Sequence, residues 1–576
     1  MTKTKQKVVI IGGGVAGLSA AHELIKRDFD VEVYELKEIP GGKARSVSVP
    51  NTGTDGRRDL PGEHGFRFFP RFYKHVTKTM SEIPFGNGTV IDNLVETTKI
   101  RLARFGQESV ILPARFPRSL EEFVQDLEGA LGADLGLTSE DKRFFAEKVW
   151  QLITSCKERR QNEYESIGWW EYLEADDHSK AYQTLFVEGL TRTLVAAKAK
   201  SASTKTGGDI FIQLIFDVAM PGMSSDRILN GPTNDVWMNP WLDFLKASGV
   251  KYHTNAPLVK INALNHNINN VVVNLHGQDT VINADYFICA VPIEVMAKYI
   301  TPEMITLDPS MKNIITLSDS VAWMNGAQFY LNTDVTLVHG HAIYIDTPWA
   351  LTSISQKQFW KVDLAEFGNG NVKGILSIDI SDWDSLGLLE WEEKDEKGNK
   401  IYVRKAAKNC TRDQVLQEIW HQLKLSLNVD GEEVLKDEYL ITNFLDPDIK
   451  FVDGKSFNEE PLLVNTVNSW MLRPFAYTGI PNLFLASDYV KTNTDLATME
   501  GANEAARRAV NCILAKSNSP APVCEIYEMH EPLVFSLFKW IDRQRFKKGL
   551  PWSPHLPWWL SPLQIVRSLF FKLTGK

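Results

Sequence analysis

The first 35 residues alternate between apolar and small segments in an order that predicts a strand, a turn, a helix and a second strand. Val8–Ile11 is a short apolar run, which is typical of a buried strand. A glycine-rich turn at 12–17 follows it directly, and Leu18–Lys26 then has the alanine-rich composition of a packed helix. Val31–Tyr34 is a second strand, and it ends at an acid, Glu35. This succession predicts a βαβ unit within a parallel sheet.

The glycines of this turn have the spacing GxGxxG, which dinucleotide-binding proteins place around a pyrophosphate. Gly12 would permit the tight turn, Gly14 would let the backbone approach the pyrophosphate, and Gly17 would let the helix pack on the strand. Ala16 lies at the helix start, where free N–H groups and the helix dipole favour an anion. Glu35 can accept hydrogen bonds from both hydroxyls of a ribose and would repel a 2′-phosphate, which argues against NADP.

Two further glycine motifs follow, Gly41–Ser46 and Gly62–Phe69. Both resemble motifs of the flavin-dependent amine oxidase and phytoene desaturase superfamily. The resemblance implies that the cofactor is FAD. It also implies that Gly42 lets the backbone wrap the pyrophosphate, and that Lys43 or Arg45 contacts phosphate or flavin.

The same resemblance places the motif Gly62–Phe69 beside the isoalloxazine ring of the flavin. Gly65 would give the ring room, and His64 and Arg67 become candidates for contact with the ring or the substrate, and so for catalysis. A packed histidine and an ordinary ion pair are equally good interpretations of these two side chains. No metal site is expected, because the five cysteines are scattered without the spacing of metal ligands.

Two later segments of the superfamily return to the flavin, and both have counterparts in this chain. Ala256–Ile261 resembles the strand that brings a valine backbone onto the adenine, and Val259 matches that valine. Asn482–Tyr489 resembles the last strand, and its acid, Asp488, would accept hydrogen bonds from the ribityl or pyrophosphate side. The N–H groups that open the next helix would stabilise negative charge on the flavin; they belong to Met499, Glu500 and Gly501.

These segments predict an α/β fold in which a Rossmann-type FAD-binding domain is assembled from discontinuous parts of the chain. An α+β substrate domain fills the insertions, and a helical amphipathic tail follows. The predicted boundaries are 1–105, 235–310 and 460–515 for the FAD-binding domain, 106–234 and 311–459 for the substrate domain, and 516–576 for the C-terminal tail.

Within the superfamily, the chain most resembles phytoene desaturase-like enzymes, which include carotenoid desaturases, carotene isomerases and hydroxysqualene dehydroxylases. This resemblance implies an FAD-dependent oxidoreductase that desaturates a long apolar lipid, such as a carotenoid or another isoprenoid, by hydride transfer to flavin N5. A quinone or oxygen would then accept the electrons. The apolar segment Gly207–Ala219 would supply a wall for such a substrate.

Three other functions fit the same residues. A redox-neutral enzyme could use reduced flavin to isomerise or dehydroxylate an isoprenoid. A soluble amine oxidase could use Trp470, Phe475 and Tyr477 as an aromatic cage. A non-enzymatic flavoprotein could bind a lipid and keep FAD for structure alone.

Charge is distributed unevenly, and this changes the expected partner. The net charge of −9 argues against nucleic-acid binding. From Leu533 onward, eight Lys or Arg and one acid, Asp542, make a segment of +7 that also holds four tryptophans. Its two apolar helical stripes, at 533–541 and 565–573, favour the surface of an anionic membrane, although packing on the protein body is the alternative. We therefore expect a cytoplasmic protein with peripheral membrane association.

Overall fold

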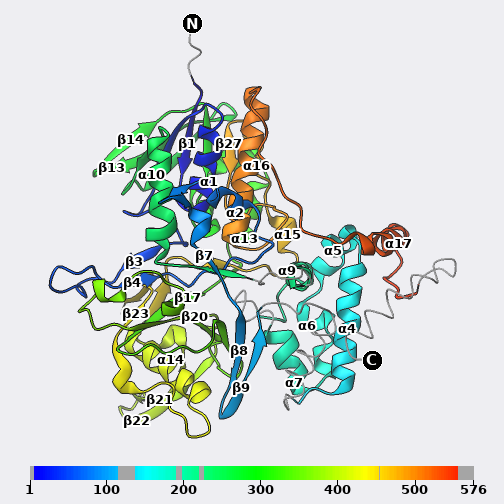
Figure 1. Cartoon of the computed structure of the whole chain (residues 1–576). Coiled ribbons are helices and arrows are strands. Elements are labelled where there is room, and N and C mark those ends of the chain that lie inside the picture. Colours follow the sequence, from blue (N-terminus) through cyan, green and yellow to red (C-terminus); the bar gives the residue numbers. More distant parts are fainter. Residues whose placement is uncertain (1–4, 115–135, 190–197, 219–225, 453–454, 556–576) are drawn as a thin grey trace.

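The computed structural model describes residues 5–114, 136–189, 198–218, 226–452 and 455–555. These residues form three parts: a parallel sheet with helices at the top of the view, a seven-stranded sheet below it, and a group of helices at the side (Figure 1). Each part is built around a separate cluster of buried apolar side chains. The arrangement confirms the predicted α/β architecture.

The parallel sheet contains the predicted βαβ unit, formed by β1 (Lys7–Ile11), α1 (Val15–Ile25) and β2 (Asp30–Tyr34). β1 lies at the centre of the sheet and pairs in parallel with β2 and β15. The sheet order is β11 (Lys251–His253), β2, β1, β15 (Tyr286–Cys289) and β27 (Leu483–Leu485). Strands from three distant segments therefore share one sheet, and β1, β15 and β27 are its most apolar and most buried strands.

Two helices that are far apart in sequence, α1 and α16 (Met499–Ser517), pack against each other beside this sheet (Figure 1). Gly17 in α1 lies against the turn after β1, where a Cβ atom would come within 1.9 Å of the Gly12 carbonyl oxygen. Glycine is therefore required at this position for the helix to approach the strand. An antiparallel sheet completes this part, with strands β12 (Leu258–Leu264), β13 (Asn267–Leu275) and β14 (Gln278–Ile282).

The seven-stranded sheet carries the insertions between the flavin-binding segments. Its order is β23 (Leu440–Leu445), β17 (Asn325–Leu331), β20 (Gly374–Ile380), β19 (Leu351–Ser355), β18 (Gly340–Tyr344), β8 (Lys99–Arg104) and β9 (Gln107–Pro113). α14 (Arg412–Leu427) packs on it and shares its apolar core. Because β8 pairs with β18, the chain leaves the flavin-binding part before Lys99, and not at the predicted boundary of 105. Conversely, α13 (Met311–Leu317), predicted as substrate domain, belongs to the core of the flavin-binding part.

The helical part includes α4 (Ser139–Thr154), α5 (Lys157–Asn162) and α9 (Thr204–Val218), and the tail helix α17 (Ser536–Lys547) docks on it. Phe538 contacts Trp150 with ring centroids 5.3 Å apart. The carboxylate of Asp542 accepts hydrogen bonds from Arg159 Nε and from the Cys156 N–H, each at 2.9 Å. One face of α17 thus packs on the protein body. Such packing is the alternative to membrane binding that the sequence analysis gives for the tail.

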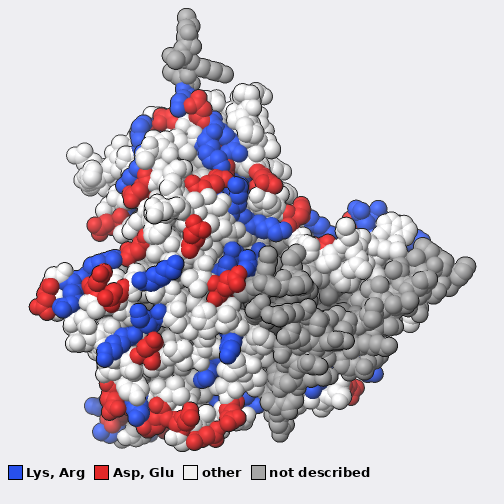
Figure 2. Space-filling view, in the orientation of Figure 1, with Lys and Arg blue, Asp and Glu red and all other residues white. Residues whose placement is uncertain are grey.

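The other side of this tail segment is apolar and exposed. Leu533 is 88% exposed, and Val534 and Trp540 are half exposed. In Figure 2 basic side chains lie beside uncharged surface where Figure 1 shows α17. The second predicted stripe, 565–573, lies outside the described residues. Among the residues that the structure describes, no helix is long and apolar enough to cross a membrane.

Candidate flavin and substrate site

A cavity of about 940 Å³ begins at the carboxyl ends of the parallel strands and extends to the helical part. The turn after β1, Glu35 after β2, Pro292 after β15 and Asp488 after β27 all line it. Parallel α/β sheets bind nucleotides at this edge, because the strand ends and helix N-termini converge there. The cavity therefore lies where the sequence predicts the cofactor.

Glu35 lies at one end of the cavity with its carboxylate held by the backbone. It accepts hydrogen bonds from the N–H groups of Gly13, at 2.5 Å, and Lys37, at 2.8 Å. Burial raises the pKa of Glu35, and these two donors oppose that rise. A carboxylate fixed in this way is suited to bind the hydroxyls of a ribose.

The strand predicted to contact the adenine places a different residue on the cavity wall. Leu258 lines the cavity, whereas the next residue, Val259, does not and is 43% exposed. Successive side chains of a strand point to opposite faces, so of two neighbouring residues one faces the cavity and the other faces solvent. The Leu258 side chain therefore joins the cavity wall, and the contact between the Val259 backbone and the adenine stays a prediction.

The glycine turns form a cradle without side chains. Gly12, Gly14 and Gly42 line the cavity, and a Cβ on Gly42 would lie 3.0 Å from the Gly14 Cα. No acid lies in the first turn of α1, and its N-cap residue provides no side-chain hydrogen bond. The first N–H groups of this helix, next to Ala16, are therefore available to an anion. The cradle fits the pyrophosphate of a dinucleotide.

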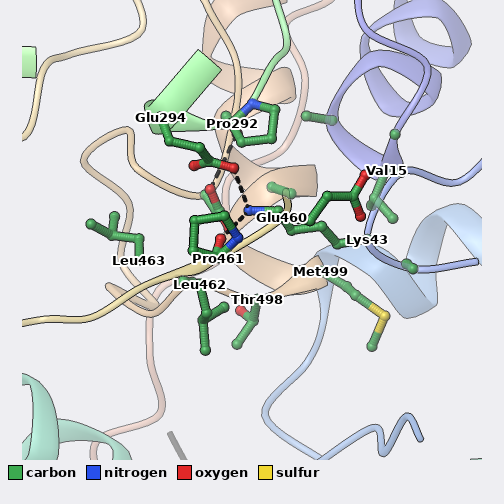
Figure 3. A pocket seen from close by; sticks show the side chains of 18 of the residues that line it. Val15, Lys43, Pro292, Glu294, Glu460, Pro461, Leu462, Leu463, Thr498 and Met499 are labelled. Atoms are coloured by element: carbon green, nitrogen blue, oxygen red, sulfur yellow. Dashed lines mark hydrogen bonds and ion pairs between the residues drawn. The ribbon is translucent and has the colours of Figure 1, made fainter. Parts of the chain in front are cut away.

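Of the two basic candidates in the second glycine motif, only Lys43 lines the cavity. Its ammonium group lies between the Glu294 carboxylate, at 2.9 Å, and the Pro461 carbonyl (Figure 3). Arg45 is 2% exposed and lies behind the wall, where it pairs with Asp448 and Glu460. Lys43 is thus placed to contact the cofactor, whereas Arg45 forms buried ion pairs that stabilise the structure.

His64, Gly65 and Arg67 line the middle of the cavity. His64 Nδ1 lies 2.7 Å from a carboxylate oxygen of Asp446; burial raises the pKa of that acid, but the neighbouring His64 lowers it to about 2. Arg67 pairs with Glu63 at 2.9 Å and donates to the Lys43 carbonyl at 2.7 Å. Both predicted catalytic residues therefore face the cavity while acids and carbonyls fix their side chains.

The start of α16 departs from the prediction in part. Met499 lines the cavity, but the Gly501 N–H already donates to Thr498 Oγ1 at 3.2 Å. The Glu500 carboxylate accepts three backbone N–H groups at 2.8–2.9 Å, and so caps α2 (His75–Met80). The predicted contact at Gly501 is thus corrected, since its N–H caps its own helix. The Glu500 side chain serves a neighbouring helix, and the contact through the Glu500 N–H stays a prediction.

The cavity wall toward the helical part, called the apolar half below, is mainly apolar, although Ser203, Thr206 and Asn465 also line the cavity. α9 contributes Ile210, Phe211 and Leu214, as expected of the predicted apolar segment. The remaining apolar wall comes from three other segments and includes Phe66, Phe68, Trp169, Leu462, Leu463 and Val464. A long apolar molecule would fit this half beyond the motif at 64–68.

The three aromatic residues suggested as the cage of an amine oxidase do not line this cavity. Phe475 and Tyr477 stack on each other and line a separate cavity of about 290 Å³. Both are about half exposed, and Trp470 lines neither cavity. The prediction that these three aromatic residues enclose a substrate is therefore wrong.

Four acids on the wall were not predicted: Glu294, Asp379, Glu459 and Glu460. Glu294 follows the Ala-Val-Pro end of β15 and has no motif of its own. Asp379, however, is the only charged residue in the strand Gly374–Ile380. A buried acid is unfavourable unless it is hydrogen-bonded, paired or protonated. An acid within an apolar strand therefore marks a candidate functional residue that could have been found in the sequence.

Comparison with known proteins supports the same cofactor. The family model described as flavin containing amine oxidoreductase matches residues 15–514. Among solved structures, a putrescine oxidase variant is similar over 89% of this chain and 99% of its own, with a TM-score of 0.60 and 13% identity. A cyclohexylamine oxidase from Brevibacterium oxydans covers 89% of this chain and all of its own, with a TM-score of 0.58 and 11% identity. At these identities the likeness concerns the fold.

Curated sequence relatives match shorter segments. The carotenoid phi-ring synthase of Chlorobaculum tepidum is 42% identical over 71 residues, which is 12% of this chain and 10% of that protein. The zeta-carotene desaturase of Zea mays is 29% identical over 116 residues, or 20% of this chain and 18% of its own. The matched segments therefore span a small part of these relatives. The family match, by contrast, covers most of the chain, and the chain belongs to the flavin containing amine oxidoreductases, as an FAD-dependent oxidoreductase.

Proposed function

We propose that this enzyme oxidises a long apolar polyene or isoprenoid, by hydride transfer from an activated carbon to flavin N5. The observation that carries the proposal is the apolar half of the cavity, which continues directly from the predicted flavin contacts at His64 and Gly65. The sequence relatives named as carotenoid enzymes support the same class of substrate.

Different residues along the cavity would bind different parts of the cofactor and the substrate. Glu35 would hold the ribose, the glycine cradle would hold the pyrophosphate, and Lys43 and Asp488 would contact the flavin half of the cofactor. Bound FAD supplies the redox chemistry, because its ring accepts a hydride. The apolar walls from α9 and from Leu462–Val464 would orient the substrate and exclude water.

Membrane contact would supply such a substrate. Leu533 and Val534, just before the docked helix α17, and Trp540 within it are exposed, with Lys547 and Lys548 nearby in the sequence. Apolar side chains with basic neighbours bind the interface of an anionic bilayer. We therefore propose peripheral attachment through this segment, with a quinone or oxygen as the final electron acceptor.

Product analysis tests the proposed reaction. Purified FAD-loaded protein would be incubated with zeta-carotene in liposomes, with oxygen or a short-chain quinone as acceptor, and the pigments separated by chromatography. We expect products with additional conjugated double bonds. A product of unchanged hydrogen content would instead establish a redox-neutral isomerase, and unchanged zeta-carotene with both acceptors would contradict the proposal for this substrate class.

A further inference from the structure

Asp379 occupies an unusual position near the end of β20. Its side chain is 5% exposed and lines the cavity. Oδ1 has no hydrogen-bond partner among the residues that the structure describes. A Cβ on Gly65 would lie 3.0 Å from this oxygen, so the acid directly adjoins the motif predicted to run beside the flavin ring.

Two other buried acids of the chain help to show what is special about Asp379. Burial raises the pKa of Glu63 and of Glu165 to about 7, although hydrogen bonds oppose the rise in each. Both carboxylate oxygens of Glu63 are bonded, to the Thr233 N–H and Oγ1 and to Arg67. Glu165 bonds Ser203 Oγ at 2.5 Å and the Trp470 N–H at 2.7 Å. Neither acid lines the cavity.

The charges around Asp379 favour a carboxyl group that can ionise. Burial raises its pKa to about 7, while Arg67 and His64 on one side and His341 of β18 on the other act in the opposite direction. The Phe66 N–H also stabilises the carboxylate. A carboxyl group balanced near neutral pH, with one oxygen unused by the protein, is suited to exchange protons with a bound molecule.

We propose that Asp379 is the catalytic base of the reaction, and this inference rests on the function proposed above. One carbon of the substrate gives up hydrogen with both bonding electrons, as hydride, to the flavin. The neighbouring carbon loses a proton to Asp379 Oδ1, and the electrons of that C–H bond form the new double bond. The substrate thus loses two hydrogens, and Asp379 later returns its proton to water.

The matched variants are Asp379→Asn, Asp379→Glu and Glu165→Gln. Asparagine keeps the size of the side chain but cannot accept the proton, and glutamate keeps the acid. Glu165→Gln is the control, because it removes another buried acid with a raised pKa that lies off the cavity wall. FAD content and thermal unfolding would first show that each variant is folded and loaded.

The first measurement needs no substrate. Infrared difference spectra of FAD-loaded protein across neutral pH should show a protonated carboxyl group that ionises near pH 7 and is lost in Asp379→Asn. Glu165→Gln should lose a different band. A spectrum that Asp379→Asn leaves unchanged would overturn the proposal.

The second measurement is anaerobic flavin reduction by zeta-carotene in liposomes. Asp379→Asn should slow it by about 100-fold or more, Asp379→Glu by less, and Glu165→Gln by less than about twofold. The wild-type rate should rise with pH through about 7 and then level off, whereas the asparagine variant should lose this rise. If the wild type is reduced and Asp379→Asn is reduced equally fast, only the base is wrong. If the wild type is not reduced at all, the proposed function fails and this inference fails with it.

Discussion

The ammonium group of Lys43 lies 2.9 Å from a carboxylate oxygen of Glu294, and both side chains line the cofactor cavity (Figure 3). This ion pair joins the second glycine motif to α11 (Ile293–Tyr299), the helix after β15. Burial raises the pKa of Glu294, and Lys43 opposes that rise. The pair therefore places one positive charge on the wall and holds it against a nearly buried acid.

Replacing Lys43 with methionine should weaken FAD binding. The variant loses one charge-assisted hydrogen bond to the cofactor, which corresponds to roughly tenfold to a hundredfold in Kd. Titration of apoprotein with FAD, followed by quenching of flavin fluorescence, measures this change.

Arg45→Met is the matched control, because Arg45 lies behind the wall. Its loss leaves Asp448 and Glu460 without their buried partner, which should cost about 3–5 kcal/mol of unfolding free energy. Folded protein with this substitution should keep most of its FAD affinity. The opposite pattern, with Lys43 dispensable and Arg45 needed for FAD in stable protein, would show that the phosphate contact is misassigned.

Glu35→Gln tests the ribose contact with a small change of shape. Glutamine can accept from only one of the Gly13 and Lys37 N–H groups, which donate to different oxygens of Glu35, and it loses the charge on each ribose bond, so FAD affinity should fall by at least roughly tenfold. Isothermal titration of apoprotein with FAD and with riboflavin separates the effect. Riboflavin lacks the adenosine, and its binding should be unchanged; an equal loss for both ligands would mean that Glu35 acts elsewhere.

The exposed apolar side of the tail makes a separate prediction. Leu533→Ser combined with Trp540→Ser should reduce binding to anionic liposomes by at least about tenfold, because both side chains would be buried in the interface. Phe538→Ala is the control, since Phe538 packs on Trp150 and its loss should lower stability by about 3–5 kcal/mol. If the folded double variant still floats with liposomes as efficiently as the wild type, another part of the protein attaches it to the membrane.

The sequence predicts the flavin-binding half of the site well, because its signals are local. A glycine turn between a strand and a helix, or an acid at a strand end, can be recognised from neighbouring residues alone, whatever the rest of the fold. The residues that line the cavity as predicted are Gly12, Gly14, Ala16, Glu35, Gly42, Lys43, His64, Gly65, Arg67, Asp488 and Met499.

The sequence does not predict features that depend on distant contacts or on strand register. Val259 and Leu258 differ by one position, and only the strand pairing decides which of them faces the cavity. The acids that bind Arg45 lie more than 400 residues away, so no local pattern reveals that this side chain is already paired. Glu500 caps a helix that begins at His75, which is likewise a long-range contact.

Glu165 predicts how stability should depend on pH. Its pKa is about 7 in the folded protein, whereas an unperturbed glutamate has a pKa of 4.5, so the folded state holds the extra proton between these values. The contribution of Glu165 to unfolding free energy is therefore present below about pH 4.5 and is lost as the pH rises to about 7. Relative to wild type, Glu165→Gln should gain roughly 1–3 kcal/mol across this range. Urea unfolding at several pH values measures the difference, and a constant offset would contradict the assignment.

The most direct test of the proposed substrate class is anaerobic bleaching of the bound flavin. Oxidised wild-type protein would be mixed with liposomes that contain zeta-carotene, and in parallel with putrescine and cyclohexylamine, while the visible absorbance of the flavin is recorded. We expect loss of this absorbance with the polyene and none with either amine, because the cavity wall that α9 and its neighbours contribute is mainly apolar. Bleaching by an amine, with no response to the polyene, would contradict it.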